Sequence, residues 1–466
     1  MKFSGKRVLV LGLGESGLAM AQWLTRQGAQ VRVADSRSEP PFAAELRRTA
    51  APAELVTGSF NRALLDDVAA LGLSPGLALS EPLVQEAVAR GITVLGEIEL
   101  FAQALRDLGL REACKIIAIT GTNGKTTTTS MIGAMCRAAG KTTAVAGNIS
   151  PAALAALMAA LDAGQAPQVW VLELSSFQLE TTQGLDADAA TVLNVTDDHL
   201  DRYTGLDDYA SAKARIFSAH TVQVLNRQDA RVMAMRRAGA QVISFGVDAP
   251  HTQDDFGLLD GWLVRGDERL LRSDELAVSG LHNAANALAA LALCRAIGLP
   301  EAPVLQALPN FKGLPHRVEK LAELEGVTWY DDSKGTNVGA TVAALQGLGC
   351  KVVLIAGGDG KGQDFSPLSP ALADHGRALV LIGRDATTIE AAVADCGVPV
   401  LHAQDMEQAV RKAAVAARAG DAVLLSPACA SFDMYRNYVH RAEVYATALH
   451  DLAATRENAH AMRAAQ

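Results

Sequence analysis

The chain contains 466 residues, and at roughly 150 residues per domain this length favours about three domains. Asp and Glu number 51 against 42 Lys and Arg, so the formal charge is −9, which argues against a generally basic nucleic-acid-binding protein. Hydrophobic residues make up 49% and charged residues 20% of the chain, a composition that is typical of a folded α/β protein and excludes wholesale disorder.

The six cysteines show no CxxC pattern or paired spacing, which favours buried free thiols in a reducing compartment. No uncharged apolar run reaches the roughly 18 residues that a membrane-spanning helix needs. Lys2, Lys6 and Arg7 imitate the start of a signal peptide, but glycines and Glu15 interrupt the apolar stretch that follows. We therefore expect a cytoplasmic protein that has no membrane or nucleic-acid partner.

The first part of the chain has the pattern of a βαβ unit. Residues 7–11 are predicted to form a strand, residues 17–27 a helix and residues 30–34 a second strand. A helix is expected over residues 97–110, where the chain leaves this region. The first domain boundary is therefore placed near residue 109.

A second βα unit begins with a predicted strand over residues 115–119, and the α/β pattern continues to an apolar helix over residues 282–297. Closely spaced prolines between residues 300 and 315 indicate a linker, so the second boundary is placed near residue 313. Beyond it, predicted strands alternate with Ala-rich helices, and these strands cover residues 351–356, 378–382 and 422–425.

A glycine-rich segment, GLGESG at residues 12–17, lies between the first predicted strand and helix, and Asp35 ends the next strand. The glycines permit a tight turn, the helix N-terminus favours phosphate, and the acidic residue can accept a hydrogen bond from a sugar or base. The segment predicts a nucleotide site, which need not bind NAD. The alternative is a turn that serves only helix–strand packing.

A second glycine-containing segment, TGTNGKTT at residues 120–127, resembles a shortened phosphate-binding loop. Ile119 stands where the strict pattern has glycine. The backbone N–H groups and Lys125 can bind phosphates, and the Thr126 hydroxyl can bind Mg²⁺. The alternative is a Thr-rich helix cap.

Two polar clusters follow apolar segments further along the chain. Glu173 is the one charge in a predicted strand over residues 169–174, and a predicted strand over residues 192–195 leads to the cluster 196–201, which contains His199. A carboxylate inside an apolar strand is costly unless it is paired or binds a metal. Behind a phosphate loop, a Mg²⁺ role for Glu173 and His199 is favoured over a structural one.

Six segments in this order resemble the motifs of the Mur ligase family: GTNGKT at 121–126, ELSSFQL at 173–179, NVTDDHLD at 194–201, GLHNAAN at 280–286, PHR at 315–317 and DDSKGTN at 331–337. Five more segments are similar to the members that use D-glutamate: GLGESG at 12–17, DSR at 35–37, SPG at 74–76, GNI at 147–149 and LSPACASFD at 425–433. The resemblance covers nearly the whole chain.

The resemblance implies an ATP-dependent ligase of peptidoglycan precursor synthesis that acts as a monomer. A carboxylate of UDP-N-acetylmuramoyl-L-alanine would take the γ-phosphoryl group of ATP, and the amine of D-glutamate would attack the acyl phosphate through a tetrahedral intermediate. Mg²⁺, as two ions, is the implied cofactor. The implied fold has three α/β domains: a Rossmann-like UDP-substrate domain over residues 1–109, a P-loop-type ATP-binding domain with a mostly parallel sheet over 110–313, and a Rossmann-like amino-acid-binding domain over 314–466.

The resemblance also implies a role for each of several residues. The catalytic residues are Lys125, His199 and Lys213. The metal ligands are Thr126, Glu173, His199 and Lys213. The ATP contacts are Gly121, Thr122, Asn123, Gly124, Lys125, Thr126, Thr127, Asn283, Asn286, Arg317 and Asp331. The UDP-substrate contacts are Ser16, Asp35, Ser36, Arg37, Ser74, Gly76, Asn148 and His199. The D-glutamate contacts are Thr336, Lys361, Ser431 and Tyr438.

Lys213 would serve as a carbamate, because carbamate oxygens bind Mg²⁺ whereas an ammonium repels it. Without the resemblance, Lys213 would be interpreted as an exposed helical lysine, Lys361 as an exposed turn lysine, and Asn283 and Asn286 as helix-capping residues.

Three other functions remain open from the sequence. A folylpolyglutamate-type ligase would leave the glycine-rich N-terminal region with Asp35 unexplained. A nicotinamide-dependent oxidoreductase would leave Lys125, Glu173 and His199 without a role, and a non-catalytic nucleotide sensor would not need intact metal and phosphate positions. Residues 247–275 carry no motif that we can assign.

Overall fold

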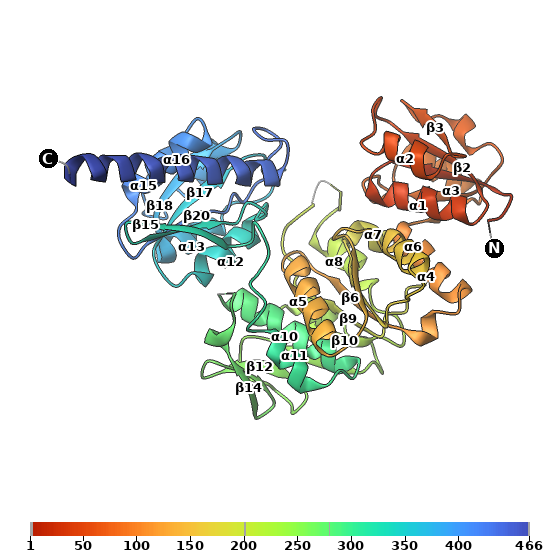
Figure 1. The fold of residues 1–466 in the computed structure, drawn as a ribbon, viewed down its shortest axis with the longest axis horizontal. Coiled ribbons are helices and arrows are strands. Elements are labelled where there is room, and N and C mark those ends of the chain that lie inside the picture. Colours follow the sequence, from red (N-terminus) through yellow and green to blue (C-terminus); the bar gives the residue numbers. More distant parts are fainter. Residues whose placement is uncertain (1–2, 200–201, 279, 465–466) are drawn as a thin grey trace. The chain divides into compact units, whose positions relative to one another are not determined.

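A computed structural model describes residues 3–199, 202–278 and 280–464 of the chain (Figure 1). Within these residues the strands form three sheets, of five, nine and six strands, with helices packed against them. Most strand pairs are parallel, which confirms the predicted α/β fold. The chain divides into two compact units. The first unit is Met1–Val195, Asp207–Leu271 and Asn286–Leu308, and the second is Thr196–Leu206, Arg272–Ala285 and Pro309–Gln466.

The N-terminal sheet has the order β3-β2-β1-β4-β5, and all of its strands are parallel. The predicted βαβ unit is confirmed, with the helix beginning two residues earlier than expected because Gly14 already adopts an extended N-cap conformation. The strands are β1 (Arg7–Leu11), β2 (Gln30–Asp35), β3 (Glu54–Thr57), β4 (Val68–Leu73) and β5 (Thr93–Leu95). The helices are α1 (Glu15–Arg26), α2 (Ala43–Thr49), α3 (Pro82–Ala89) and α4 (Glu97–Asp107).

Alternate residues of these strands face two different layers. Leu9 and Leu71 pack against Val84 of α3 in one buried cluster. On the other side of β4, Gly72 lies against Val10 and against Met20 of α1. Burial on both faces explains why β4, and β1 after Arg7, consist of apolar residues.

The central sheet has the order β14-β13-β12-β11-β10-β9-β6-β8-β7. Its strands are β6 (Lys115–Thr120), β7 (Thr143–Gly147), β8 (Val169–Glu173), β9 (Ala189–Val192), β10 (Val222–Asn226), β11 (Val242–Phe245), β12 (Phe256–Leu259), β13 (Trp262–Arg265) and β14 (Glu268–Arg272). Residues 247–275, to which no motif was assigned, contain β12, β13 and β14. These three strands extend one edge of the sheet. β12 and β13 pair antiparallel.

The helices of the middle part of the chain are α5 (Lys125–Ala138), α6 (Ala153–Asp162), α7 (Ser176–Glu180), α8 (Leu206–Ala214), α9 (Ala230–Ala234), α10 (Leu281–Ala296) and α11 (Glu301–Ala307). The apolar helix predicted over residues 282–297 is α10. Short 3₁₀ turns lie at Arg62–Leu65, Arg111–Ala113 and Ser273–Glu275.

The strand predicted over residues 192–195 is wrong, because β9 ends at Val192. The following backbone groups bond to side chains instead of to a neighbouring strand. Asn226 donates to the carbonyl of Leu193 over 2.9 Å, and Asp229 accepts from the N–H of Val195 over 2.8 Å. These side-chain contacts end the strand three residues before the predicted end and leave residues 193–195 as an ordered loop.

The C-terminal sheet has the order β15-β16-β20-β17-β18-β19, and only the β15–β16 pair is antiparallel among the pairings described. Its strands are β15 (Glu319–Leu324), β16 (Val327–Asp331), β17 (Val352–Gly357), β18 (Gly376–Ile382), β19 (Val400–His402) and β20 (Ala422–Leu425). The helices are α12 (Val338–Gly347), α13 (Leu368–His375), α14 (Ala386–Ala392), α15 (Met406–Ala416) and α16 (Tyr438–Ala464).

Two buried clusters lie on opposite faces of this sheet. Leu354 packs with Leu372 of α13 in one cluster, whereas Ile355 packs with Val410 of α15 and Tyr445 of α16 in the other. The period-2 alternation of β17 thus divides the core into two layers. None of the helices within the described ranges combines the length and hydrophobicity required to cross a bilayer.

Replacing Gly17 by alanine should destabilise the N-terminal sheet region. A Cβ on Gly17 would lie 1.9 Å from the carbonyl oxygen of Gly12, so the turn and α1 would have to move apart. We expect Gly17→Ala to lower the free energy of unfolding by roughly 1–3 kcal/mol, measured by urea denaturation. Gly14→Ala is the matched control in the same turn, since its Cβ would meet only the Ser74 hydroxyl at 3.9 Å. Equal stability of the two variants would contradict the prediction.

Candidate active site

The loop between β6 and α5 has a backbone that only glycine can follow. Gly121 has φ +151° and Gly124 has φ +83°. A Cβ on Gly121 would lie 3.0 Å from the Cβ of Leu193, and one on Gly124 would lie 2.4 Å from Oδ1 of Asn286. The glycines are therefore required both by conformation and by the close approach of neighbouring segments.

Asn194 fixes the shape of this loop from the end of β9. Its carbonyl accepts from Thr122 N over 2.9 Å, its Oδ1 accepts from Asn123 N over 2.8 Å, and its Nδ2 donates to the Asn123 carbonyl over 3.1 Å. Asn194 begins the motif NVTDDHLD at residues 194–201, but no role was predicted for it. Its place near the end of the predicted strand 192–195, just before the polar cluster 196–201, was the available sequence signal.

Lys125 is the first residue of α5, and its side chain folds back over the loop. Nζ donates to the carbonyls of Gly121 over 2.9 Å and of Thr122 over 2.8 Å. The positive end of the helix dipole and the lysine charge thus coincide, an arrangement suited to a polyphosphate. Asn286 is also nearby, because Thr128 of α5 donates to its Oδ1 over 3.3 Å. This position inside α10 argues against helix capping as the role of Asn286.

Lys213 is 1% exposed, so its interpretation as an exposed helical lysine is wrong. Its Nζ donates to the Gly121 carbonyl over 2.9 Å and lies 4.2 Å from the centre of the Tyr209 ring. Lys125 and Lys213 therefore share one carbonyl acceptor. Two amines at one carbonyl repel each other when both are charged, and burial of Lys213 adds a desolvation cost.

Glu173 ends β8, which pairs with β6 so that Glu173 lies opposite Ile119. The side chain is buried, and Oε1 accepts from Nδ2 of Asn148 over 2.8 Å. Oε2 is buried and has no hydrogen-bond partner among the residues that the structure describes. A buried carboxylate oxygen without a donor fits a divalent cation, so the residues present fit Mg²⁺ beside the phosphate loop.

Asp35 organises the glycine-rich N-terminal turn. It is buried, and it accepts from Leu13 N over 2.7 Å and from Nε and Nη2 of Arg37 over 2.8 and 2.6 Å. The hydrogen bonds from Arg37 are the main reason that the pKa of Asp35 falls to about 2, against the opposing effect of burial. Asp35 is thus ionised and held by the protein, while the Arg37 side chain stays half exposed.

Four more of the residues predicted for the UDP substrate, Ser16, Ser36, Ser74 and Gly76, follow β1, β2 and β4 at the carboxyl ends of these strands, whereas Asn148 follows β7. Ser74 follows β4, donates its N–H to the Leu11 carbonyl over 2.9 Å, and lies against Gly12 of the turn. Ser16 is half-buried, whereas Ser36 and Gly76 are exposed. Ligands of open α/β sheets bind at this edge.

His199 has φ +56° and belongs to the second unit. Asp198 orients it, because Oδ1 accepts from His199 N over 3.0 Å and Oδ2 lies 3.7 Å from Nε2. Asn337 in turn donates to Oδ2 of Asp198 over 3.4 Å. Residues 200 and 201 of the predicted cluster lie outside the described residues.

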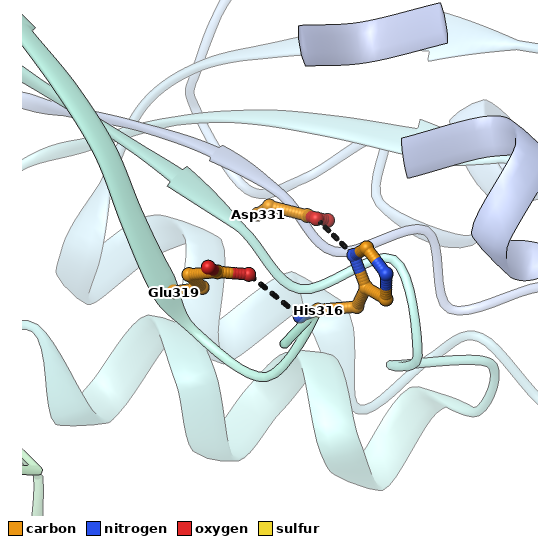
Figure 2. Close-up of side chains that lie close together, drawn as sticks. All are labelled: His316, Glu319 and Asp331. Atoms are coloured by element: carbon orange, nitrogen blue, oxygen red, sulfur yellow. Dashed lines mark hydrogen bonds and ion pairs between the residues drawn. The ribbon is translucent and has the colours of Figure 1, made fainter. Parts of the chain in front are cut away.

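Asp331, His316 and Glu319 form a compact group at the start of the C-terminal sheet (Figure 2). Nδ1 of His316 lies 2.6 Å from Oδ2 of Asp331, and His316 N donates to Oε2 of Glu319 over 2.9 Å. The other oxygen of Asp331 accepts from Ser333 N over 2.8 Å. Both oxygens of Asp331 and one oxygen of Glu319 are thus engaged in contacts within the protein, and these contacts fix the turn that carries Arg317.

Asp332 was not predicted as a site residue, and it is buried beside Asp331. It accepts from the Ser426 hydroxyl over 2.6 Å and from Val318 N over 3.3 Å. Burial raises its pKa to about 7, although Ser426 and the charge of Arg317 act in the opposite direction. The sequence gives no indication of which of the two adjacent aspartates, Asp331 or Asp332, has the raised pKa.

Three of the residues predicted for D-glutamate, Thr336, Lys361 and Ser431, lie on the loops that follow β16, β17 and β20, and Tyr438 is the first residue of α16. Lys361 is exposed at φ +51°, Ser431 is buried, and Thr336 and Tyr438 are half-buried. Gln363 ties two of these loops together, because Nε2 donates to the carbonyls of Gly360 and Ala428 over 3.0 and 2.9 Å. The exposure of Lys361 is compatible both with a contact to D-glutamate and with the alternative of an exposed turn lysine.

Arg441 of α16 is a second residue that the sequence analysis missed. It is 0% exposed and donates to the Ser333 carbonyl over 2.8 Å and to the Cys429 carbonyl over 3.1 Å. Burial lowers its pKa to about 10. In the sequence, Arg441 is recognisable only as an arginine four residues before Tyr445, which is buried. This spacing does not reveal that Arg441 joins the loops after β16 and β20.

The first turn of α10 is held by close packing in the second unit. The His282 ring lies against Gly280 and Gly347, where a Cβ would come within 2.8 and 2.9 Å of its Cε1. Burial is the main reason that the pKa of His282 is lowered. Asn283, the next residue, is buried.

Comparison with known proteins gives matches along nearly the whole chain. Family profiles match three segments: "Mur ligase MurD-like, N-terminal domain" at residues 6–96, "Mur ligase middle domain" at 119–294 and "Mur ligase, glutamate ligase domain" at 316–429. The chain is 58% identical over 462 residues to the UDP-N-acetylmuramoylalanine–D-glutamate ligase of Nitrosospira multiformis, covering 98% of each chain. It is 57% identical over 467 residues to the protein of that name from Thiobacillus denitrificans, again covering 98% of each.

Among solved structures, the fold resembles UDP-N-acetylmuramate–alanine ligase from Thermotoga maritima, with a TM-score of 0.59 and 20% identity over 96% of this chain and 99% of that one. It also resembles a pseudomurein peptide ligase from Methanothermus fervidus, with a TM-score of 0.57 and 18% identity over 90% and 96% of the two chains. At these identities the likeness concerns the fold.

The buried Asp332 should make stability fall with rising pH. In the unfolded chain it ionises near its ordinary value of 3.8, whereas in the folded chain it keeps its proton up to about pH 7. Stability is therefore lost between about pH 4 and 7, and a pKa difference of about three corresponds to roughly 4 kcal/mol. Asp332→Asn cannot ionise, so its free energy of unfolding should rise relative to wild type across this window by up to this amount.

The measurement is urea denaturation of both proteins at several pH values from 4 to 8. Asp374→Asn, at an exposed position of α13, is the control and should give a small, pH-independent difference. A difference for Asp332→Asn that stays flat with pH would show that the carboxyl ionises alike in the folded and unfolded chain.

Proposed function

The chain belongs to the Mur ligase family, and on this premise we propose that it joins D-glutamate to UDP-N-acetylmuramoyl-L-alanine in an ATP-dependent step of peptidoglycan precursor synthesis. The full-length similarity to enzymes named for this reaction supports the substrates. In the structure, the observation that carries the proposal is the buried Glu173 carboxylate oxygen beside the glycine phosphate loop, which has no hydrogen-bond partner in the described part of the chain.

ATP would bind with its phosphates on the loop that contains Gly121 and Gly124. Lys125 offsets their negative charge and holds the γ-phosphoryl group for transfer, which requires positioning and charge stabilisation more than a protein nucleophile. Thr126 and Glu173 would hold Mg²⁺, and the bound ion supplies positive charge that neutralises the phosphate oxygens. The remaining ATP contacts proposed are Thr122, Asn123, Thr127, Asn283, Asn286, Arg317 and Asp331.

The reaction then runs in two balanced steps. The acceptor carboxylate attacks the γ-phosphorus, and ADP leaves. The amine of D-glutamate attacks the carbonyl carbon of the acyl phosphate, loses a proton, and phosphate leaves with the bonding electron pair from the tetrahedral intermediate. His199, oriented by Asp198, is proposed for a second metal ion and for the muramoyl-alanine part.

The UDP end of the acceptor would bind at the glycine-rich turn through Ser16, Asp35, Ser36, Arg37, Ser74 and Gly76. Since Asp35 already bonds to Leu13 and Arg37, we propose that it shapes this site while the half-exposed Arg37 faces the substrate. Asn148, which bonds to Glu173, would lie toward the carboxylate end of the acceptor.

D-glutamate brings two carboxylates, which need cations and hydroxyl donors. Lys361, Thr336, Ser431 and Tyr438 are proposed for this role. We also propose domain limits near residues 109 and 313. Because one chain carries every residue invoked, we propose a monomer, and because ATP is the energy source, we propose that it acts in the cytoplasm.

A carbamate on Lys213 is proposed to resolve the conflict at the Gly121 carbonyl. Lys125 and Lys213 both donate to this atom, and addition of CO₂ to the Lys213 amine would replace one of two repelling cations by an anion. Its oxygens are suitable Mg²⁺ ligands.

ADP release provides the test of the function. We expect release only when UDP-N-acetylmuramoyl-L-alanine and D-glutamate are both present, and a fall of at least about 100-fold in kcat for Lys125→Ala, because the phosphate countercharge is lost. Lys141→Ala, beyond the other end of α5, is the control. Release that ignores the sugar nucleotide would favour a folylpolyglutamate-type ligase, NAD(P)H turnover an oxidoreductase, and no release a nucleotide sensor.

Chemical rescue tests the carbamate. Lys213→Ala should lower kcat about 100-fold, since the side chain that would hold charge at the phosphate site is removed. Added acetate should restore part of the activity because its oxygens can occupy the cavity, whereas methylamine should not. The readout is ADP release at increasing additive concentration, with Lys125→Ala as a variant that acetate should not rescue. Rescue by the amine alone would refute the carbamate.

A further inference from the structure

Glu15 stands in the glycine-rich turn, yet its carboxylate contacts a segment of the central sheet region. It is the first residue of α1 and is exposed. Its Oε1 accepts from the Ser150 hydroxyl over 2.8 Å and from Ala152 N over 3.0 Å. One oxygen of Glu15 thus joins the turn at residues 12–17 to the loop between β7 and α6.

That loop, residues 148–152, also carries the partner of the proposed metal carboxylate. Asn148 donates its side chain to Oε1 of Glu173 over 2.8 Å and its N–H to the Glu173 carbonyl over 2.7 Å. The loop closes on itself, because Gly147 N donates to the Pro151 carbonyl over 3.0 Å. A short closed loop therefore bonds to Glu15 at one end and to Glu173 at the other.

A second carboxylate, that of Glu97, contacts the start of α6, which follows this loop. Glu97 of α4 accepts from Leu154 N in the first turn of α6 over 2.5 Å. Burial, with a smaller contribution from the nearby charge of Glu15, raises the pKa of Glu97 to about 7, against the opposing effect of the Leu154 hydrogen bond. Because a pKa of about 7 leaves a substantial fraction of Glu97 protonated at neutral pH, the repulsion between Glu15 and Glu97 at the N-terminal amides of α6 is reduced.

We propose that Glu15 is a positioning residue that fixes the separation between the turn that binds the UDP of the acceptor and the loop that orients Glu173. This inference rests on the proposed function, because it assumes the UDP substrate at the turn. The acceptor must reach from this turn to the γ-phosphoryl group, so its carboxylate is correctly placed only if the two segments keep their distance. A displacement near 1 Å can cost on the order of 100-fold in rate.

Two substitutions of Glu15 separate positioning from charge. Glu15→Ala removes both hydrogen bonds, whereas Glu15→Gln keeps an acceptor oxygen at the same place. We expect Glu15→Ala to lower kcat at least about 10-fold and to raise KM for the UDP acceptor, with KM for ATP and D-glutamate within about 2-fold of wild type. Glu15→Gln should stay within about 3-fold of wild type throughout. Glu112→Ala, at an exposed position outside the site, is the matched control.

Hydrogen exchange gives a readout that does not depend on activity. The amides of residues 150–156 should exchange faster in Glu15→Ala than in wild type, because Ala152 N loses its acceptor, and Glu15→Gln should retain the protection. Ser150→Ala, which removes one of the two bonds, should change kcat in the same direction by less and keeps the proposal testable even if Glu15→Ala does not fold.

The proposal is overturned if Glu15→Ala keeps wild-type kcat and exchange, if Glu15→Gln is as impaired as Glu15→Ala, or if all three KM values rise together. When Glu15→Ala does not fold, wild-type kcat in Ser150→Ala overturns it. Wild-type protein that releases no ADP refutes the proposed function instead, while the exchange comparison still decides whether Glu15 holds the loop.

Discussion

The constraint on which the active-site geometry depends is a carboxylate buried at the end of a central strand. Glu173 cannot be solvated, and only one of its oxygens has a donor, Asn148, among the described residues. Because β8 lies beside β6, the free oxygen is held next to the glycine loop. Asn194 then fixes the loop, and Lys125 and Lys213 converge on its first carbonyl. The loop conformation and the position of the proposed metal carboxylate are thus both set by one pair of neighbouring strands.

Features encoded by local sequence were predictable. The strands at residues 7–11 and 115–119, the glycine turns that follow them and helix α10 lie where the residue patterns indicated. These elements depend on hydrophobic periodicity and on glycine conformations, both of which are read within a few residues. Ser74 lies beside the first glycine-rich turn because β1 and β4 are parallel neighbours, so that their carboxyl ends meet at one edge of the sheet. This proximity was predictable only from the parallel strand order.

Features set by distant partners were not predictable from such patterns. The burial of Lys213 depends on its approach to Gly121, and the end of β9 depends on Asn226 and Asp229. The raised pKa of Asp332 and the burial of Arg441 depend on segments that are far apart in the chain. The resemblance to a family supplied roles for Lys213 and Asp331, but it could not supply their burial or their hydrogen bonds.

The two buried layers of the C-terminal sheet have a consequence for how this region tolerates change. Leu372 and Val410 belong to clusters on opposite faces and have no common packing partner in them. Substitutions at well-separated sites without shared partners combine nearly additively, whereas those at contacting residues within one layer are coupled. Core substitutions on the α13 face can therefore accumulate independently of those on the α15 face. A destabilising substitution in one layer would be compensated by a second substitution in the same layer.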